Sequence, residues 1–89
     1  MAGPYTLNPE QGWGGIPTWH LGKSTKLCVQ NLDASRSGQV YIKSSDASTP
    51  ASEYVEVAPG GTTCIERYWA GIPINANNSG FTRVQVWTE

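Results

Sequence analysis

Apolar and polar residues alternate with a period of two along most of this chain, a pattern typical of strands with one buried and one exposed face. The clearest example is residues 53–68, where two alternating segments flank an Ala-Pro-Gly-Gly turn at 58–61. Proline fixes one backbone angle, and the two glycines can adopt positive φ. The segment therefore predicts a β-hairpin, with Val55, Val57 and Ile65 facing the core.

Similar alternation predicts further strands elsewhere and no long helix. The predicted strands are 25–31 with Leu27 and Val29 inward, 39–43 with Val40 and Ile42 inward, a short edge strand with Ile72 and Ile74 around Pro73, and 81–88 with Val84 and Val86 inward. Polar turns are predicted at 33–38, 44–50 and 75–80. About six or seven short strands separated by turns predict an all-β fold, a single small antiparallel β-sandwich of the jelly-roll or immunoglobulin-like kind.

Residues 1–23 differ from the rest of the chain. Prolines and glycines interrupt this segment, but its Tyr, Trp, Leu and Ile residues make it too apolar for a disordered tail. We therefore expect an extended N-terminal arm over 1–23, with a short strand at Trp19-His20-Leu21, and a sandwich domain over 24–89. Trp13, Ile16 and Trp19 are expected to pack onto a sheet face of the same chain or of a neighbouring subunit.

Aromatic residues also occupy the phase opposite to the aliphatic core positions. These residues are Tyr41, Tyr54, Tyr68, Phe81 and Trp87. The outer face of an uncovered sheet usually carries Thr, Lys and Glu. The rings therefore predict a cover, which could be the N-terminal arm, a second subunit or a ligand.

Charge excludes some classes of partner. Charged residues make up 15% of the 89 residues, and the net charge is −1. The chain has no basic footprint for nucleic acid, no apolar run of the ~20 residues that a membrane span needs, and no signal-peptide pattern at its start. The compartment stays unassigned, although the polar, weakly charged composition favours a virion or extracellular assembly over a cytoplasmic enzyme.

The sequence lacks the residues that most catalytic sites require. It has one histidine, no spacing typical of a Ser/His/Asp triad, and no phosphate-binding glycine loop. We therefore expect no enzyme activity, no cofactor and no metal. Cys28 and Cys64 are either two buried thiols or a disulfide pair. Both are out of phase with the aliphatic residues around them, so they lie on the same kind of face, which permits pairing.

Two segments share the pattern Trp-small-Gly-Ile-Pro, at 13–17 and 69–73. This repeated pattern is a coincidence, or it marks two structurally equivalent corners of the fold. A third alternative is a sugar site, in which tryptophan faces stack on a pyranose ring and asparagines bind its hydroxyls. The candidate sugar contacts are Trp13, Trp19, Trp69, Asn75, Asn77 and Asn78. Asn77-Asn78-Ser79 also matches an N-glycosylation acceptor, which we interpret as a plain turn.

The turn sequence Val-Ala-Pro-Gly-Gly-Thr-Thr at 57–63, followed by Ile65 and the strand at 83–86, resembles small β-sandwich accessory domains over residues 24–88. It is similar in style to phage virion decoration proteins and to jelly-roll subunits of extracellular filaments. In those families an N-terminal arm often reaches onto the next subunit. The resemblance implies an assembly role and assigns no functional residue.

These observations predict a non-enzymatic structural subunit that binds copies of itself or a larger protein assembly. The candidate assembly contacts are Trp13, Ile16, Trp19, Tyr41, Tyr54, Tyr68 and Trp87. The alternative is a small carbohydrate-binding module that uses the Trp and Asn residues named above.

Overall fold

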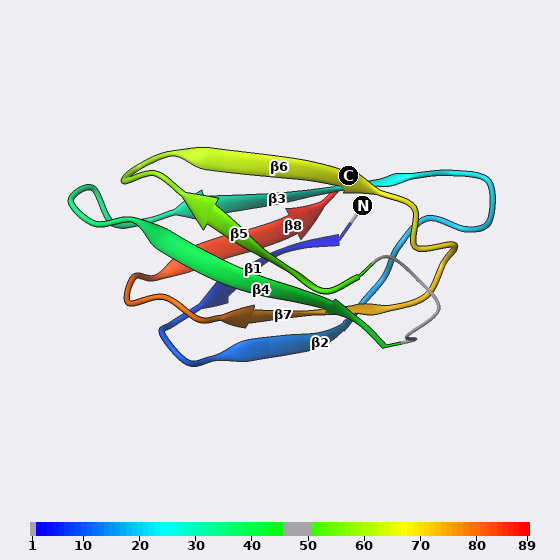
Figure 1. Cartoon of the computed structure of the whole chain (residues 1–89), viewed down its shortest axis with the longest axis horizontal. Coiled ribbons are helices and arrows are strands. Elements are labelled where there is room, and N and C mark those ends of the chain that lie inside the picture. Colours follow the sequence, from blue (N-terminus) through cyan, green and yellow to red (C-terminus); the bar gives the residue numbers. More distant parts are fainter. Residues whose placement is uncertain (1, 46–50) are drawn as a thin grey trace.

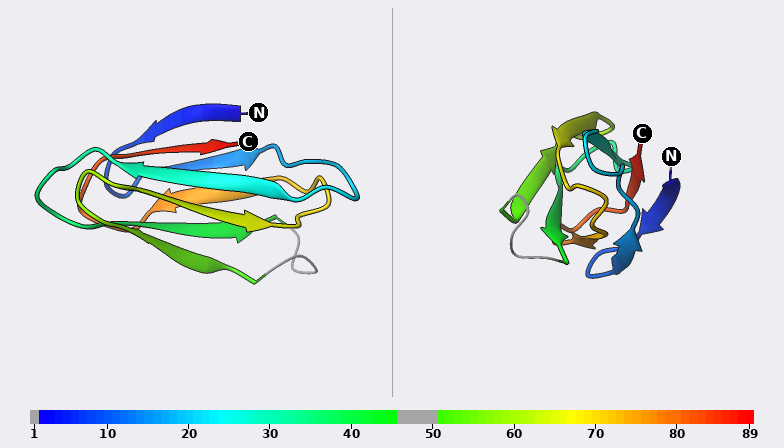
Figure 2. Two further views of the ribbon diagram at one scale, coloured as in Figure 1. Left: turned by 90° about the horizontal axis from the view of Figure 1, so that it is seen from above. Right: turned by 90° about the vertical axis from the view of Figure 1, so that its right-hand side faces the viewer.

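The computed structural model describes residues 2–45 and 51–89. Within these residues the chain forms eight strands and no helix, arranged as two four-stranded sheets that pack together (Figure 1 and Figure 2). This confirms the small all-β sandwich predicted from the alternation. Of the predicted turn at 44–50, residues 46–50 lie outside the described residues.

Every strand pair in the two sheets is antiparallel. Sheet A contains, in spatial order, β1 (Ala2–Leu7), β8 (Val84–Thr88), β3 (Thr25–Asn31) and β6 (Thr62–Arg67). Sheet B contains β2 (Gly12–Ile16), β7 (Ile74–Asn78), β4 (Gly38–Ser44) and β5 (Glu53–Val57). Each sheet thus combines strands that are far apart along the chain.

The predicted hairpin at 53–68 is wrong in its pairing. Its two strands exist as β5 and β6, but β5 pairs with β4 in sheet B and β6 pairs with β3 in sheet A. The turn between them crosses from one sheet to the other, with Gly60 at a φ of 66° and the Gly61 N–H donating to the Ala58 carbonyl. Alternation identifies the buried face of each strand, but it does not identify the strand's partner.

The N-terminal segment supplies one edge strand to each sheet of its own chain. β1 pairs with β8, and β2 pairs with β7. The register of β1 shifts between Ala2 and Tyr5, where Gly3 has a φ of 87°. A Cβ at Gly3 would lie 2.8 Å from the Val86 carbonyl oxygen, so this close approach of β1 to β8 requires glycine. The short strand expected at Trp19-His20-Leu21 is wrong, because these residues lie in an irregular connection between β2 and β3.

The asparagine-rich turn predicted at 75–80 is also wrong, because Ile74–Asn78 is strand β7. This strand begins after Pro73 and lies between β2 and β4, so it is an inner strand and not the predicted edge strand. Its inward residues alternate as the pleat requires, and one of them is the buried Asn78. The Asn78 amide donates to the Leu7 and Thr82 carbonyls at 3.1 and 2.6 Å. Burial is tolerated because these polar atoms are paired.

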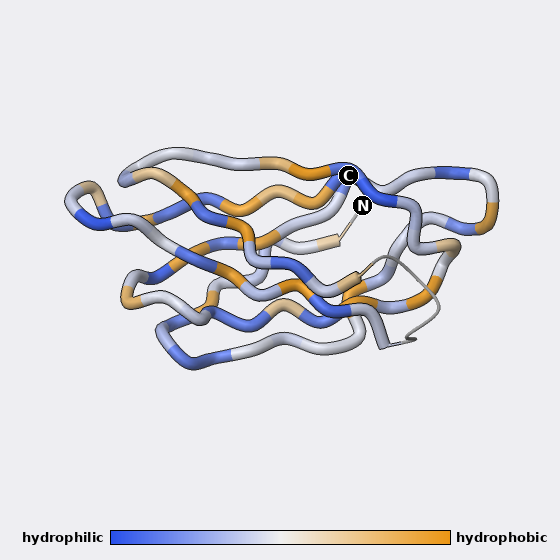
Figure 3. Tube along the Cα trace, in the orientation of Figure 1, coloured by the Kyte–Doolittle hydropathy of each residue, from blue (hydrophilic) through white to orange (hydrophobic). Residues whose placement is uncertain are grey.

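The core lies between the sheets and is mainly aliphatic. The inward positions predicted on the strands are confirmed for Leu27, Val29, Val40, Ile42, Val55, Val57, Val84 and Val86, each at most 4% exposed. Ile74 of β7 is buried with them. Ile65 packs against this core but is only partly buried. Figure 3 shows hydrophobic and hydrophilic positions alternating along the strands.

Different contacts close the two open sides of the sandwich. Between edge strands β1 and β2, the rings of Tyr5 and Trp13 stack with their centroids 4.8 Å apart. Between edge strands β5 and β6, Arg67 donates to both carboxylate oxygens of Glu53 at 3.0 and 2.9 Å. Trp13, expected to pack onto a sheet face, therefore stacks on a ring of its own chain.

Candidate functional site

The outer face of sheet A carries polar side chains in rows that cross the strands. Gln30 of β3 lies opposite Gln85 of β8, and Gln85 lies opposite Thr6 of β1. The Gln85 Nε2 group donates to Thr6 Oγ1 at 3.3 Å. Because residues two apart on a strand share a face, the next row on this face is formed by Cys64, Cys28 and Trp87.

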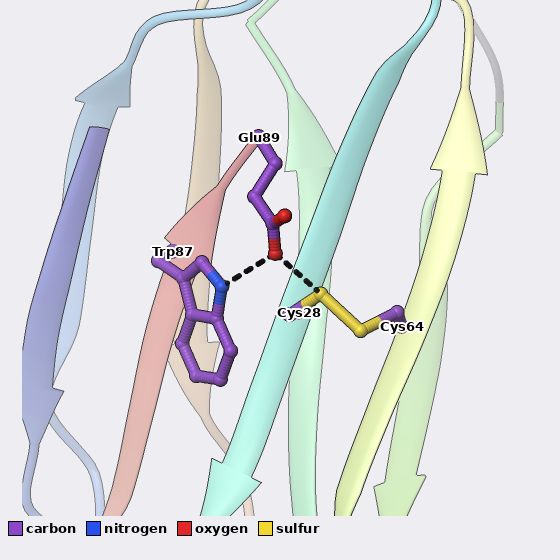
Figure 4. Close-up of a disulfide and its surroundings, with 4 residues drawn as sticks. All are labelled: Cys28, Cys64, Trp87 and Glu89. Carbon is purple, nitrogen blue, oxygen red and sulfur yellow. Dashed lines mark hydrogen bonds between the residues drawn. A yellow bond between two sulfur atoms is a disulfide. The ribbon is translucent and has the colours of Figure 1, made fainter. Parts of the chain in front are cut away.

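Cys28 and Cys64 form a disulfide across the neighbouring strands β3 and β6. Their Cα atoms are 4.0 Å apart, as in a closely spaced antiparallel pair. Cys28 is buried, whereas Cys64 is exposed to solvent. The bond thus joins an edge strand of sheet A to an inner strand, on the same face as Trp87 (Figure 4).

Trp87 and Glu89 contact each other beside this disulfide (Figure 4). The Trp87 indole Nε1–H donates to Glu89 Oε2 at 2.9 Å. The same oxygen lies 3.6 Å from Cys28 Sγ. A disulfide sulfur has no hydrogen to donate, so this second approach is a contact and not a hydrogen bond.

A hollow of about 340 Å³ lies over this part of sheet A. The side chains of Gln30, Gln85, Trp87 and Glu89 line it, and β1 contributes a further wall at residues 2–4. The absence of a side chain at Gly3 lets that wall approach, because a Cβ there would lie 3.1 Å from the Trp87 Cβ. The volume is at the lower end of the roughly 300–1,000 Å³ typical of small-molecule sites.

The outer face of sheet B carries a pair of tyrosines. Tyr41 of β4 lies opposite Tyr54 of β5, with ring centroids 4.8 Å apart, and Tyr54 is 61% exposed. Asn77 of β7 lies opposite Tyr41 on the other side. Asn75, two residues away on the same face, accepts a hydrogen bond from the Gly15 N–H at 3.2 Å. Tyr41, Tyr54, Asn75 and Asn77 are therefore brought to one face.

The six candidate sugar contacts do not meet in one place. Trp69 is only 2% exposed, and Asn78 is buried by the contacts described above, so neither presents a surface to a ligand. Trp19 lies near one end of the sandwich, with the Lys23 ammonium 3.8 Å from its ring centroid. Trp13 is 49% exposed at the open side. The two Trp-small-Gly-Ile-Pro segments therefore place their tryptophans in different environments.

The candidate assembly contacts are similarly dispersed. Ile16 belongs to the core, and Tyr68 follows the end of β6 with its hydroxyl accepting from the Gly22 N–H at 2.9 Å. Phe81, expected on the last strand, precedes β8 in a connection and is 80% exposed. Among the candidate assembly and sugar contacts, Trp87 alone borders the hollow of sheet A.

The three outward polar residues of this hollow, Gln30, Gln85 and Glu89, were not candidates from sequence. Gln30 and Gln85 share the outward phase with Cys28 and Trp87 on their own strands, which is a signal that the alternation contains. The shared phase places these side chains in one site only because β3 and β8 are neighbours in sheet A, which the alternation does not indicate.

Other chemistry is sparse in the part of the chain that the structure describes. That part contains no group of three or more His, Cys, Asp or Glu residues able to hold a metal. It also contains no helix long and apolar enough to cross a membrane.

Hydrogen bonds from the Ser35 backbone N–H and hydroxyl lower the pKa of the Asp33 carboxyl below its ordinary value. These bonds stabilise the turn between β3 and β4.

Comparisons with known proteins place the chain in a family. Residues 5–89 match the model of a family described as "Family of unknown function (DUF8244)". Two uncharacterized proteins of Dictyostelium discoideum are 38% and 36% identical over 88 residues, with 99% of each chain covered in both cases. The crystal structure of CapF with the inhibitor 3-isopropenyl-tropolone is similar at 18% identity and a TM-score of 0.47, covering 93% of this chain and 22% of that one. None of these descriptions mentions virions or filaments.

Proposed function

We propose that this chain, which belongs to the DUF8244 family of unknown function, is a carbohydrate-binding module with its site on the outer face of sheet A. The observation that carries the proposal is the hollow beside Trp87, where an indole ring lies next to the amides of Gln30 and Gln85 and the carboxylate of Glu89. The sequence analysis also considered a sugar site, but it assigned that site to other tryptophans and to asparagines of the segment 75–78.

These side chains suit the chemistry of a sugar. A pyranose ring has an apolar C–H face, which can lie on an indole, and a rim of hydroxyls, which need donors and acceptors. An amide provides both kinds of group, and a carboxylate accepts from hydroxyls. A hollow that combines an apolar surface with a few convergent polar groups is the usual form of a small-ligand site.

The site is also held in place before any ligand arrives. The Trp87 ring is fixed through its Nε1–H bond to Glu89, and the Gln85 amide is fixed by its bond to Thr6. The Cys28–Cys64 bond restrains the neighbouring strands. Side chains that are already ordered lose less conformational entropy on binding, which favours affinity.

Truncation of the indole tests this proposal. We expect Trp87→Ala to weaken binding of soluble oligosaccharides by about tenfold or more, because it removes the stacking surface. Isothermal titration with the oligosaccharides found positive on a glycan array measures the change. Tyr54→Ala is the matched control, since it removes an exposed ring from the opposite sheet. Equal affinity of Trp87→Ala and the unmodified protein would reject the site, provided that circular dichroism shows the variant to be folded.

Self-assembly is a second candidate function, favoured by one observation. Leu21 and Phe81, 76% and 80% exposed, lie in the connections before β3 and before β8. Exposed apolar side chains of this size suit a contact with another protein. The self-assembly proposal is supported by Leu21 and Phe81 and not by the N-terminal segment, because the strands of that segment pair within the chain. The likeness to decoration and filament subunits belongs to this second proposal.

Light scattering tests the second candidate. A native mass above that of one chain, falling when Leu21 and Phe81 are both replaced by Ser, is the expected result. A single-chain mass at micromolar concentration would remove it without affecting the carbohydrate proposal.

A further inference from the structure

We propose further that the hollow of sheet A selects sugars with a protonated amine, such as 2-amino-2-deoxyhexoses, over their neutral counterparts, and rejects acidic sugars. This inference rests on the proposed function and specifies its ligand. It follows from the donors and acceptors of the site and from the charges around it.

The free hydrogen-bonding groups of the site are mostly acceptors. Glu89 Oε2 accepts from Trp87, and no other donor within the described residues reaches the carboxylate, so Oε1 is available. The Gln85 amide nitrogen donates one N–H to Thr6, which leaves its second N–H and the two lone pairs of its carbonyl oxygen for a ligand. Gln30 offers one donor group and one acceptor group. A ligand that donates more hydrogen bonds than it accepts fits this set best.

The charge within the hollow is negative, because Glu89 is the one charged side chain among the described residues that line it. Lys26 of β3 lies on the same face, paired by register with Glu66 of β6 and joined by backbone hydrogen bonds to Glu89. Its ammonium is not within ion-pair distance of either carboxylate in the described chain, where the ion pairs are Arg36–Asp33 and Arg67–Glu53. Arg83, two residues before Gln85, also points outward, so the charged side chains of the wider face balance. No cationic group of the described chain lies within ion-pair distance of Glu89.

An ammonium group in the hollow would gain two interactions at once. It would donate a charge-assisted hydrogen bond to Glu89, which is stronger than a bond from a neutral hydroxyl. The nearby indole of Trp87 attracts cations through the negative face of its π-system. A carboxylate or sulfate on the sugar would meet repulsion from Glu89, and its donors in the hollow would be the neutral amide N–H groups of Gln30 and Gln85. Neutral sugars fall between these extremes.

Oligosaccharides matched in length and linkage test this selectivity. The probes are β-1,4-linked oligomers of glucosamine, N-acetylglucosamine and glucose, together with oligomers of galacturonic acid, titrated at low salt. We expect glucosamine oligomers to bind about three- to tenfold more tightly than N-acetylglucosamine oligomers, because acetylation removes the charge. The preference should shrink at high salt, since Glu89 is exposed.

Two variants separate this inference from the proposed function. Glu89→Gln keeps the shape of the side chain and should abolish the preference for the amine, measured as the ratio of amine to neutral affinity in the same variant. Glu66→Gln removes the other carboxylate of the same face, outside the hollow, and should keep the preference. Equal binding of amine and neutral oligomers, or a preference that survives Glu89→Gln, overturns the inference alone. Failure of every oligosaccharide to bind overturns the proposed function as well.

Discussion

The two outer faces of the sandwich carry similar kinds of residue but present them differently. Sheet A holds Trp87 beside a disulfide, a carboxylate and two glutamines, with a hollow bounded by β1. Sheet B holds the Tyr41–Tyr54 pair, whose outer ring projects into solvent. An exposed ring alone is common on protein surfaces and needs no functional explanation. The difference shows that a ring becomes part of a candidate site when the neighbouring backbone leaves room beside it and polar groups converge on that space.

Removal of the disulfide on sheet A should produce the largest loss of unfolding free energy. The Cys28→Ala/Cys64→Ala double variant should lose about 3–4 kcal/mol of unfolding free energy, because the bond closes a loop with a sequence separation of 36 residues. Urea denaturation monitored by fluorescence measures the loss. Dithiothreitol should produce a similar loss in the unmodified protein and none in the double variant. A double variant as stable as the parent would mean that sheet A does not depend on this cross-link.

Substitution of Gly3 in β1 should cost less unfolding free energy than removal of the disulfide, but more than truncation of Tyr54. Gly3→Ala places a Cβ against the Val86 carbonyl and the Trp87 Cβ at a φ of 87°, so we expect a cost of about 1–3 kcal/mol. Saccharide binding should also weaken, because β1 forms a wall of the hollow. Gly22→Ala serves as the control for backbone strain, since Gly22 also has positive φ but no atom would lie near its Cβ. If both variants cost the same, the close approach of β1 to Trp87 contributes little.

The smallest effect is expected on sheet B. Tyr54→Ala breaks the cross-strand contact with Tyr41 and should cost about 0.5–1 kcal/mol, the usual size of such a pair at an exposed position. Thermal melting should detect this small change, and saccharide affinity should stay the same. A loss of affinity in Tyr54→Ala would move the candidate site to sheet B, where Asn75 and Asn77 also lie.

Local sequence contained much of the fold. The alternation predicted the strands β3, β4, β5, β6 and β8 and the inward phase of their aliphatic residues. This works because the side-chain period of a strand depends only on the backbone. The same logic failed at the asparagine-rich segment, where local turn propensity opposed burial in an inner strand. Packing and the paired amide of Asn78 outweighed that propensity.

The sequence by itself therefore determined the class of the fold, the buried face of most strands and the shortage of catalytic groups. Only the tertiary structure decided which strands are neighbours, and with them the candidate site. β3 lies between β8 and β6, so Cys28 meets Cys64 on one side and Trp87 on the other, while Thr6 reaches Gln85 across a separation of 79 residues. Strand pairing is a long-range choice made by packing the whole core, and no local pattern records it.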